Sequence, residues 1–578
     1  MSKWTQDETP VCAELFELAL SYGLPTILAN YVGRIQTLSK DNLSDFITKS
    51  TSQLHDPFLL DGMHHAVQKV SEYIDNGSKI IIFGDFDVDG VTGASILYWG
   101  VRKAGLKDKP LVYIPNRFTE GHGLNLEAID KFHSQGVKLI ITADCGMGNH
   151  TEVDHAKSLG IDVVVTDHHM GKNELLNAEA VINPRLGNYP FEHLSGAGVA
   201  YKFIQALLSF RFGEESDEYN STMESCIDYV AIGTVADVMP LIGENRVLVD
   251  WGLKNMAKSR LPFIKKYWSA KLRNIELNEP FTAEHIGFQM APRINAASRL
   301  ESGIHAFDFL TSVKVEDVIQ KGRYLDFLNS ERKSRLAALK ESQKLIKYYV
   351  QDRRVLIINS QSTEKGLFGL LASYFLESED QLIAVLVLGD DPNGQLSGSA
   401  RARSGFNWFT TMQVLQDYFT RFGGHAEAAG CMIERNKLED FLRQFDKLEL
   451  SYELTQSAKY YHGCIACGDI NEKLVTYLED LGPYGEKFPR PIFKITDFNV
   501  LRSRRVGPGG RDLSFLLQGS LGVTFKGIGF HLGYLQDQLS EATGLISELN
   551  YNYDYLGDDP SIIYDLIDNK NPFCEKLS

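Results

Sequence analysis

The stretch Lys79-Ile-Ile-Ile-Phe-Gly-Asp-Phe-Asp-Val-Asp-Gly-Val-Thr92 places four apolar residues directly before three alternating carboxylates. The apolar run is typical of a buried strand that ends at the first glycine. Asp85, Asp87 and Asp89 then crowd onto a turn that Gly90 permits, and such carboxylates repel one another unless a cation lies among them. Their oxygens suit a hard divalent ion. An acidic surface turn is the alternative, but a buried strand that leads directly into the acids favours a metal site.

Five strand-like runs occur between residues 80 and 184, and helical stretches separate them. Spacings of roughly 20 to 30 residues are typical of βαβ units, so we predict an α/β fold with a doubly wound parallel sheet. Ligands of such sheets bind outside the carboxyl ends of the strands. The predicted strands are Ile80–Phe83, Leu111–Ile114, Leu139–Ile141, Val163–Val165 and Val181–Ile182, and the predicted helices include Leu126–Ser134 and His150–Leu159.

Further metal-ligand types follow the later strands of this predicted sheet. Asp144 comes after the third strand, and Asp167-His168-His169 comes after the fourth. Acids and imidazoles at strand ends of one sheet form a mixed oxygen and nitrogen site that suits Mn²⁺, Mg²⁺ or Zn²⁺. Asp228 lies in an apolar run that we predict to be a buried helix followed by a turn. A buried acid needs a partner, so Asp228 is either a further metal ligand or a structural cap or ion pair.

Several candidate phosphate-binding residues lie further along the chain. Arg293, Asn295 and Arg299 stand among small residues, where a guanidinium fork could bind phosphate or a loop could be pinned by ion pairs. A second α/β unit begins at 354–358 and carries Ser399-Ala-Arg401 and Gly423-Gly-His425. Glycines beside serine, arginine and histidine let backbone N–H groups approach a phosphate. These signals are weak when taken singly, because glycine turns are common.

Charge is distributed unevenly over the 578 residues, whose formal net charge is −16. Nine acids and two bases follow residue 530, whereas residues 321–350 hold eight bases and three acids, and residues 486–511 hold seven bases and two acids. The first basic stretch belongs to a long helical pattern over Val313–Val350. The second interleaves with Phe488, Phe493 and Phe498 in a run of predicted short strands. Bases and aromatics on a small barrel suit single-stranded nucleic acid, although a barrel core explains some of the phenylalanines.

The length suits about three or four domains, and we divide the chain into five segments. No apolar run approaches the roughly 18 residues of a membrane span, and the start lacks the apolar region of a signal peptide. Seven cysteines, an odd number, fit a reducing cytoplasm. The predicted segments are a helical N-terminal segment (1–70), a catalytic α/β domain (71–240), a helical region with the long linking helix (241–350), a smaller α/β domain (351–452) and a barrel with an acidic tail (453–578).

Together these motifs resemble the DHH phosphoesterase superfamily, and within it the bacterial exonucleases that degrade single-stranded DNA from the 5′ end. Seven matching motifs occur in the order typical of the family. Two differences concern substrate handling: Gly121-His122-Gly123 stands where Gly-Tyr-Gly is usual, and Ala-Ala-Ser-Arg299 where Ala-Ala-Gly-Arg is usual. The matching motifs are Gly84–Thr92, Asp144–Gly146, Asp167–His169, Asp228 with Gly233–Leu241, Pro292–Arg299, Ser399–Arg401 and Gly423–His425.

The resemblance implies a DHH domain, a DHHA1 domain and a C-terminal OB-like barrel, with two Mn²⁺ or Mg²⁺ ions in the first domain. Asp87, Asp89, Asp144, His168 and Asp228 would hold the ions, with Asp85 adjacent. His169 would lie against the substrate phosphate. Whether Asp85 and Asp237 also bind metal is left open. The residues implied for the terminal nucleotide and its 5′ phosphate are Arg117, Arg293, Asn295, Arg299, Ser399, Arg401 and His425.

The implied reaction is two-metal hydrolysis that releases 5′-mononucleotides from single-stranded DNA, in recombination and repair. A cytoplasmic monomer is expected, with a single-strand-binding protein or a helicase as potential partners and no membrane. One alternative is a DHH phosphodiesterase for short oligonucleotides or cyclic dinucleotides, which would leave the long helix and the barrel unexplained. Another is a non-catalytic DHH scaffold of replication, which predicts eroded metal ligands, whereas every proposed ligand here is an intact Asp or His.

Overall fold

The computed structural model describes residues 4–171, 176–272, 279–449, 459–520, 522–542, 544–552 and 561–566. The chain divides into two compact units. The larger unit holds Trp4–Asn295, Ser302–Leu325 and the chain from Tyr460 onward, and the smaller unit holds Ala296–Glu301 and Asp326–Lys459. No helix among the described residues is both long enough and apolar enough to span a bilayer.

A five-stranded parallel sheet forms the centre of the larger unit, in the order β3-β2-β4-β5-β6. The predicted parallel sheet is therefore confirmed, and each predicted strand agrees with an observed one to within two residues at either end. Both faces of the sheet are covered, which explains why strands such as β2 are apolar throughout. The strands are β2 (Ile80–Gly84), β3 (Leu111–Tyr113), β4 (Leu139–Ala143), β5 (Asp162–Thr166) and β6 (Ala180–Ile182).

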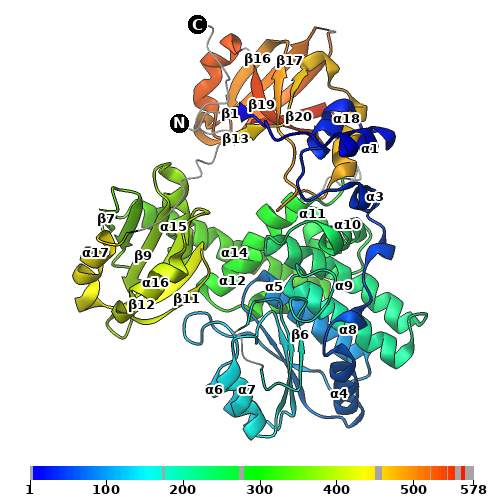
Figure 1. Cartoon of the computed structure of the whole chain (residues 1–578), viewed down its shortest axis with the longest axis vertical. Coiled ribbons are helices and arrows are strands. Elements are labelled where there is room, and N and C mark those ends of the chain that lie inside the picture. The colour runs from blue at the N-terminus through cyan, green and yellow to red at the C-terminus, as the bar shows by residue number, and fades with distance from the viewer. Residues whose placement is uncertain are drawn as a thin grey trace. The chain divides into compact units, whose positions relative to one another are not determined.

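Helices α6 (Leu126–Ser134) and α7 (His150–Ser158) cover one face of this sheet, as Figure 1 shows. Helices α5 (Val88–Lys103) and α8 (Gly196–Phe212) pack against the other face, with α4 (Met63–Asp75) beside α8. The helix α5 is buried along most of its length because it lies between the sheet and further helices. The carboxyl ends of β2, β4 and β5 therefore share one edge with the start of α5.

The segment after β2 is a helix start and not a free turn. Asp87 caps α5, and its Oδ1 accepts a hydrogen bond from the Gly90 N–H at 3.1 Å. Gly90 lies inside the helix with an ordinary φ, and a Cβ there would come within 2.6 Å of Asp85. Glycine is thus required at position 90 for close contact with Asp85, which corrects the prediction that it permits a turn.

The middle region of the chain, which contributes to both units, is helical, and one prediction for it was wrong in detail. The run around Arg293 is a helix, so the alternative of a loop pinned by ion pairs does not hold. The predicted long helix ends at Lys340, and Ile346–Val350 forms strand β7 instead, because its β-branched and aromatic residues fit a sheet. The helices are α9 (Asp217–Ala236), α10 (Gly243–Met256), α11 (Ser269–Leu272), α12 (Ala291–Leu300), α13 (Ile304–Leu310) and α14 (Val315–Lys340), with π-helical segments η3 (Phe263–Trp268) and η4 (His285–Met290).

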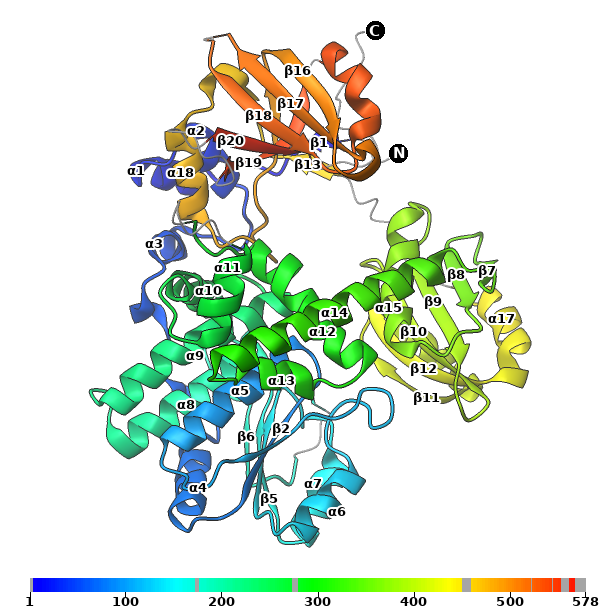
Figure 2. The same ribbon diagram turned by 180° about the vertical axis from the view of Figure 1, so that it is seen from behind.

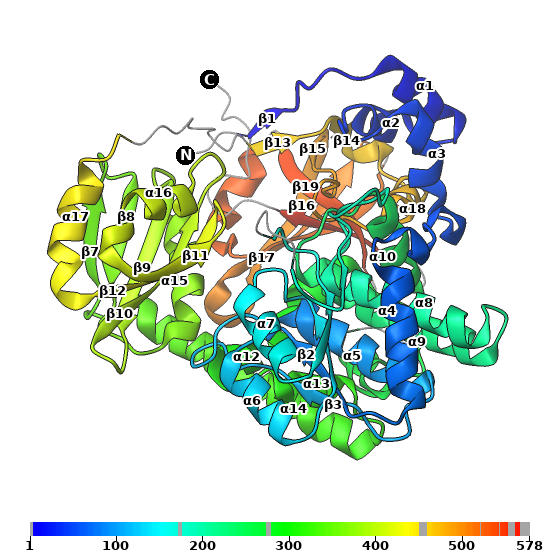
Figure 3. The ribbon, with the colours of Figure 1, turned by 60° about the horizontal axis from the view of Figure 1, so that its bottom comes forward.

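The N-terminal helices share one apolar core with the C-terminal domain. Leu28, Tyr31 and Phe46 belong to the same buried cluster as Phe488 and Leu517, and Figure 3 shows α1 and α2 beside α18. The sheet of this domain runs β14-β15-β19-β20-β18-β17-β16. The elements are β1 (Trp4–Gln6), α1 (Ala13–Ser21), α2 (Thr26–Val32), α3 (Lys40–Thr48), β13 (Lys459–Tyr461), β14 (Cys464–Ala466), α18 (Glu472–Leu481), β15 (Phe493–Thr496), β16 (Phe498–Val506), β17 (Asp512–Gly519), β18 (Thr524–Gly529), β19 (Leu545–Asn552) and β20 (Ser561–Leu566).

Two of the predicted features of this domain can be placed. Arg502, Arg504 and Arg505 lie on β16, the edge strand of the sheet as described, whereas Phe488 and Phe493 are core residues. The arginines therefore stay candidates for contacts with a strand, and those two phenylalanines do not. Five of the nine acids after residue 530 lie outside the described residues.

The smaller unit is a six-stranded sheet in the order β11-β12-β10-β9-β8-β7, and Figure 2 shows its strands with α15 and α17. Strands β8 and β9 are parallel, and the other neighbours are antiparallel. Separate apolar clusters lie on its two faces. The elements are β7 (Ile346–Val350), β8 (Val355–Asn359), α15 (Lys365–Ser378), β9 (Ala384–Asp390), β10 (Gln395–Ala402), α16 (Trp408–Val414), β11 (Phe419–Gly424), β12 (Ala428–Glu434) and α17 (Leu438–Asp446).

Candidate active site

Acids and histidines from four elements meet at the carboxyl edge of the parallel sheet. Their potential ligand atoms form three overlapping groups, and within each group all the atoms lie within 4.8 Å of one another. The groups share Asp144 and His168, so they form one continuous cluster. We call this set the metal cluster: Asp85, Asp87, Asp89, Asp144, His168, His169 and Asp237.

The start of helix α8 holds Asp89 in place. The backbone N–H groups of Gly196 and Ala197 donate to its two carboxylate oxygens at 2.6 and 2.9 Å. A Cβ at Gly196 would lie 2.4 Å from the Cβ of Asp144, and one at Gly233 would lie 2.5 Å from Asp89 Oδ1. Both glycines are therefore needed because the acids pack directly on the helices. Sequence reasoning missed Gly196, for which a small-residue run was the only signal.

His168 lies among three carboxylates. Its Nε2 is 3.1 Å from Asp144 Oδ1, 3.6 Å from Asp237 Oδ2 and 3.9 Å from Asp89 Oδ2. Asp144 adopts a left-handed backbone with φ of 62°, a strained conformation of the kind found at functional sites. These residues thus bring strands β4 and β5 together with α9 around one small volume.

The metal cluster fits a divalent cation. Asp85 Oδ1, Asp144 Oδ1 and His168 Nε2 are buried, and none has a hydrogen-bond partner of good geometry among the described residues. Buried polar atoms in that state are costly. A cation at this edge would satisfy several of them at once, and carboxylate oxygens with one imidazole form a donor set suited to Mn²⁺ or Mg²⁺.

The charges of the metal cluster repel one another. Burial and the charge of Asp87 raise the pKa of Asp89 to about 7, and burial with the charge of Asp89 raises the pKa of Asp237 to about 9. The same two causes hold the pKa of Asp144 well above its usual range. Burial and the nearby His169 lower the pKa of His168 to about 3, which keeps the imidazole neutral, as a metal ligand must be.

Asp167 orients the second histidine of the motif. Its Oδ1 accepts from the backbone N–H groups of His168 and His169 at 2.7 and 3.1 Å and lies 2.8 Å from His169 Nδ1, while Oδ2 accepts from the Met147 N–H at 3.0 Å. Burial raises the pKa of Asp167, but these hydrogen bonds outweigh burial and lower it to about 2. The sequence motif included Asp167 but assigned it no role, and the structure makes it the support of His169.

Asp228 does not join the metal cluster, so the prediction that it binds metal was wrong. It lies inside α9 with its side chain fully buried, where it accepts hydrogen bonds from Asn255 Nδ2 at 2.8 Å and from Ser259 Oγ at 2.5 Å. Asp237, the residue after the last turn of α9, reaches the metal cluster instead. The two acids are nine positions apart on the helix, a rise of about 13 Å.

Comparisons with known proteins identify the domains of this chain. Residues 79–234 match the N-terminal domain of the DHH family, residues 349–449 the DHHA1 domain, and residues 461–555 the RecJ OB domain. The single-stranded-DNA-specific exonuclease RecJ of Salmonella typhimurium is 34% identical over 468 residues, which cover 78% of this chain and 80% of that protein. The chain belongs to the RecJ family.

Other RecJ proteins show how far the likeness extends. RecJ of Bacillus subtilis is 30% identical over 88% of this chain, but the chain spans only 63% of that relative. A solved RecJ bound to manganese is 28% identical, with a TM-score of 0.58 over 69% of this chain and 96% of that one. Thermus thermophilus RecJ in complex with Mn²⁺ has a TM-score of 0.75 over 98% of this chain and 79% of that one, at 23% identity, which shows the shared fold.

Beside the metal cluster of this RecJ-family chain lies the loop that carries Arg117 and His122. The Arg117 guanidinium lies 4.5 Å from the centre of the Phe86 ring, and His122 Nδ1 is 3.0 Å from Asp85 Oδ1. Burial lowers the pKa of His122, but the charge of Asp85 outweighs burial and raises it to about 9. The structure therefore places Arg117, which the family resemblance assigns to the terminal nucleotide, beside the metal cluster together with His122.

The remaining predicted substrate residues fall in both units. In the larger unit, Arg293 Nη1 donates to Gln289 O and lies beside its Oε1, and Asn295 follows on the same helix, α12. In the smaller unit, Arg299 Nη1 donates to Gly366 O at 3.3 Å, at the start of α15.

A basic corner of the smaller unit surrounds that helix start. A Cβ at Gly369 would lie 2.8 Å from the Arg401 guanidinium and 3.1 Å from Ser399 Oγ. His425 follows Gly424, which pairs with Ala429 beside the strand position of Arg401. Arg299, Ser399 and Arg401 thus gather at one helix N-terminus, and His425 lies at the same end of the sheet, an arrangement suited to an anion.

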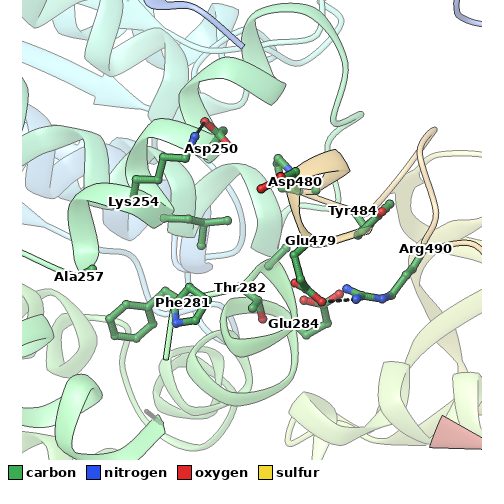
Figure 4. Close-up of a pocket in the computed structure, with 15 residues that line it drawn as sticks. Asp250, Lys254, Ala257, Phe281, Thr282, Glu284, Glu479, Asp480, Tyr484 and Arg490 are labelled. Atoms are coloured by element: carbon green, nitrogen blue, oxygen red, sulfur yellow. Dashed lines mark hydrogen bonds and ion pairs between the residues drawn. The ribbon is translucent and has the colours of Figure 1, made fainter. Parts of the chain in front are cut away.

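A cavity of about 360 Å³ elsewhere in the larger unit does not suit DNA (Figure 4). Lys254 pairs with Asp250 at 2.7 Å, and Arg490 pairs with Glu479. Both bases of the cavity are therefore neutralised, and its remaining acids would repel a polyanion. The charged residues that line it are Asp250, Lys254, Glu284, Glu479, Asp480 and Arg490.

Proposed function

We propose that this chain is a single-stranded-DNA-specific 5′→3′ exonuclease that releases 5′-mononucleotides by hydrolysis with two Mn²⁺ or Mg²⁺ ions. The metal cluster carries the proposal, because its buried oxygens and neutral imidazole fit divalent cations at the ligand edge of a DHH fold. The named activity of the relatives, single-stranded-DNA-specific exonuclease, supports the substrate.

The residues that would hold the ions are those predicted, with one replacement. Asp87, Asp89, Asp144 and His168 keep their proposed roles, and Asp237 takes the place of Asp228. Two divalent ions held there would lower the pKa of a bound water and offset negative charge that develops at the scissile phosphate. His169, which Asp167 orients through Nδ1, leaves its Nε2 able to contact a phosphate oxygen.

The basic residues have separate proposed tasks. Arg117 lies at the metal cluster and suits the scissile phosphate. Arg293 and Asn295 suit the strand backbone. Ser399, Arg401, Arg299 and His425, on the smaller unit, suit the 5′-terminal phosphate, which would restrict the enzyme to one strand polarity. We further propose a cytoplasmic monomer that acts in recombination and repair, with a single-strand-binding protein or a helicase as partner.

Strands labelled at either end test the proposed function. Single strands and duplexes carrying a 5′ or a 3′ label should be incubated with Mn²⁺, with Mg²⁺ or with EDTA. We expect labelled mononucleotide at once from the 5′-labelled single strand, a shortening ladder from the 3′-labelled one, and no product with EDTA. Hydrolysis of dinucleotides or cyclic dinucleotides with long strands untouched would instead support a small-substrate phosphodiesterase.

The 5′-phosphate assignment has its own prediction. Arg401→Ala should reduce kcat/KM on a 5′-phosphorylated strand at least tenfold and change it little on a 5′-hydroxyl strand, because one charge-assisted contact contributes about 1.5–3 kcal/mol. Arg403→Ala is a control on the same segment, since Arg403 bonds backbone carbonyls of its own unit. Equal losses on both strands would place Arg401 away from the 5′ end.

A further inference from the structure

Three strongly exposed apolar side chains adjoin the metal cluster. Phe288 is 76% exposed, Met170 71% and Val238 65%, so they rank among the most exposed large apolar residues described. Met170 directly follows His169, and Val238 directly follows Asp237. The 3.6 Å approach of His168 Nε2 to Asp237 Oδ2 brings these two segments together.

Phe288 reaches the same region through helix packing. It lies on the π-helical segment η4, which packs against α9. Gly287 faces the end of α9, since a Cβ added there would lie 3.9 Å from Val235 Cγ1. Val235 is two residues before Asp237 in the last turn of α9. Phe288 therefore stands next to the end of the helix that delivers Asp237 to the metal cluster.

The backbone on either side of Phe288 is held by buried neighbours, although the ring itself is exposed to solvent. Ile286 and Met290 on either side of it are fully buried. Arg293 Nη1 donates to the carbonyl of Gln289 at 2.7 Å and lies 3.0 Å from its side-chain oxygen, which fixes the next turn. Single π-helical turns are frequent at functional sites, and this one presents a large aromatic ring to solvent.

The exposed ring of Phe288 suits contact with unpaired nucleobases. The metal cluster is the proposed place of the scissile phosphate, and Arg293 adds positive charge one turn away, so a strand bound there brings its bases against the adjacent surface. Every base offers a π-face to an aromatic side chain, whereas the bases of a duplex are already stacked and paired. An apolar protein segment would gain nothing from the cations of a metal site.

We propose that Phe288, flanked by Val238 and Met170, forms a stacking platform for the unpaired bases next to the scissile phosphate. The proposal rests on the proposed function and deepens it, because it makes the enzyme select single strands by their accessible bases as well as by their backbone. The platform tolerates all four bases, since stacking reads no hydrogen-bond pattern.

A double-mutant cycle, in which Phe288 and the DNA base are removed singly and together, tests the platform. Binding should be measured for strands whose first linkages are non-hydrolysable phosphorothioates, with either normal or abasic nucleotides next to the 5′ end. Wild-type protein should bind the normal strand at least tenfold more tightly than the abasic one, a difference that lies within what one stacked base contributes. Phe288→Ala should lose at least tenfold on the normal strand and nothing further on the abasic one, and Phe288→Trp should restore the preference.

Phe210→Ala is the matched control. Phe210 is 56% exposed and lies on α8, fourteen residues after Gly196, which is about 21 Å along the helix from the metal cluster. It should leave both affinities unchanged. Equal losses on normal and abasic strands for Phe288→Ala, or a change in oligomeric state instead of DNA affinity, would overturn the platform. If wild-type protein prefers the normal strand over the abasic one through Phe288 but never degrades a strand, the proposed exonuclease activity would be wrong and the stacking platform would still be supported.

Discussion

Two acids on one helix have different tasks in this chain. Asp237 follows the last turn of α9 and lies in the metal cluster, with Oδ2 3.6 Å from His168 Nε2. Asp228 lies earlier in the same helix and accepts hydrogen bonds from Asn255 and Ser259. Position along the helix therefore separates a proposed ligand from a structural acid of the same type.

Asp237→Asn should lower the exonuclease rate by at least a hundredfold, about 2.7 kcal/mol in activation free energy. The amide would remove one anionic oxygen from the metal cluster, so Mn²⁺ affinity measured by calorimetry should fall as well. Asp228→Asn is the matched control and should retain both Mn²⁺ affinity and activity. Loss of Mn²⁺ binding in Asp228→Asn would show that Asp228 is a metal ligand after all.

Asp228 also predicts a pH dependence of stability. Burial raises its pKa to about 7 in the folded protein, against about 3.9 in an unfolded chain. The folded state thus binds this proton more tightly, and the stabilisation is complete below about pH 4 and is lost as the pH rises through 7. Asp228→Asn stays neutral, so its unfolding free energy relative to wild type should rise between about pH 4 and 7 and then level off in urea titrations. Parallel curves for the two proteins would show that Asp228 titrates normally.

At the scale of elements, the N-terminus of α8 supports the acids of the sheet. Its first two N–H groups hydrogen-bond Asp89, and its Gly196 lies against Asp144 without room for a side chain. A helix start is a natural partner for a carboxylate because its N–H groups and dipole both favour negative charge.

Gly196→Ala should therefore displace the start of α8 and reduce both activity and thermal stability. The added Cβ would meet Asp144 at 2.4 Å, a distance that real contacts do not show. Gly198→Ala is the control on the same helix, because its added Cβ would meet Leu194 at an ordinary 3.4 Å. Melting temperature, Mn²⁺ affinity and exonuclease rate should all fall for the first variant and change little for the second. Normal Mn²⁺ affinity in Gly196→Ala would contradict the role of this helix.

At the scale of the whole molecule, the N-terminal helices complete the C-terminal domain, and Arg246 of α10 joins both to the helical region. Arg246 is 1% exposed, donates to Phe46 O at 3.0 Å and Pro483 O at 2.9 Å, and lies 3.7 Å from the Phe46 ring centre. Burial lowers its pKa to about 10, so it stays charged at neutral pH.

Arg246→Met should destabilise this junction by about 2–4 kcal/mol, because several buried carbonyls lose their donor. Hydrogen exchange should accelerate in α3 and α18, while α6 and α7 stay protected. Arg211→Met is the control, since Arg211 pairs with an exposed Asp75 and such pairs contribute little. Unchanged exchange in α3 and α18 would show that the shared apolar core alone holds the junction.

Local pattern in the sequence was sufficient for the parallel sheet and for most of the metal cluster. Apolar runs bounded by glycine and acid specify buried strands, and parallel strands bring their carboxyl ends to one edge, so Asp85, Asp144 and His168 could be placed together in advance. Tertiary structure alone decided that Asp237 and not Asp228 reaches that edge, because both acids follow apolar helical residues and only packing sets which end meets the sheet. It also decided that helices before residue 50 share a core with strands after residue 460 and that Phe288 stands in solvent beside Asp237. Contacts between residues so far apart in sequence cannot be predicted from local periodicity. The pattern of each segment shows that it has an apolar face, but it does not show which other segment packs against that face.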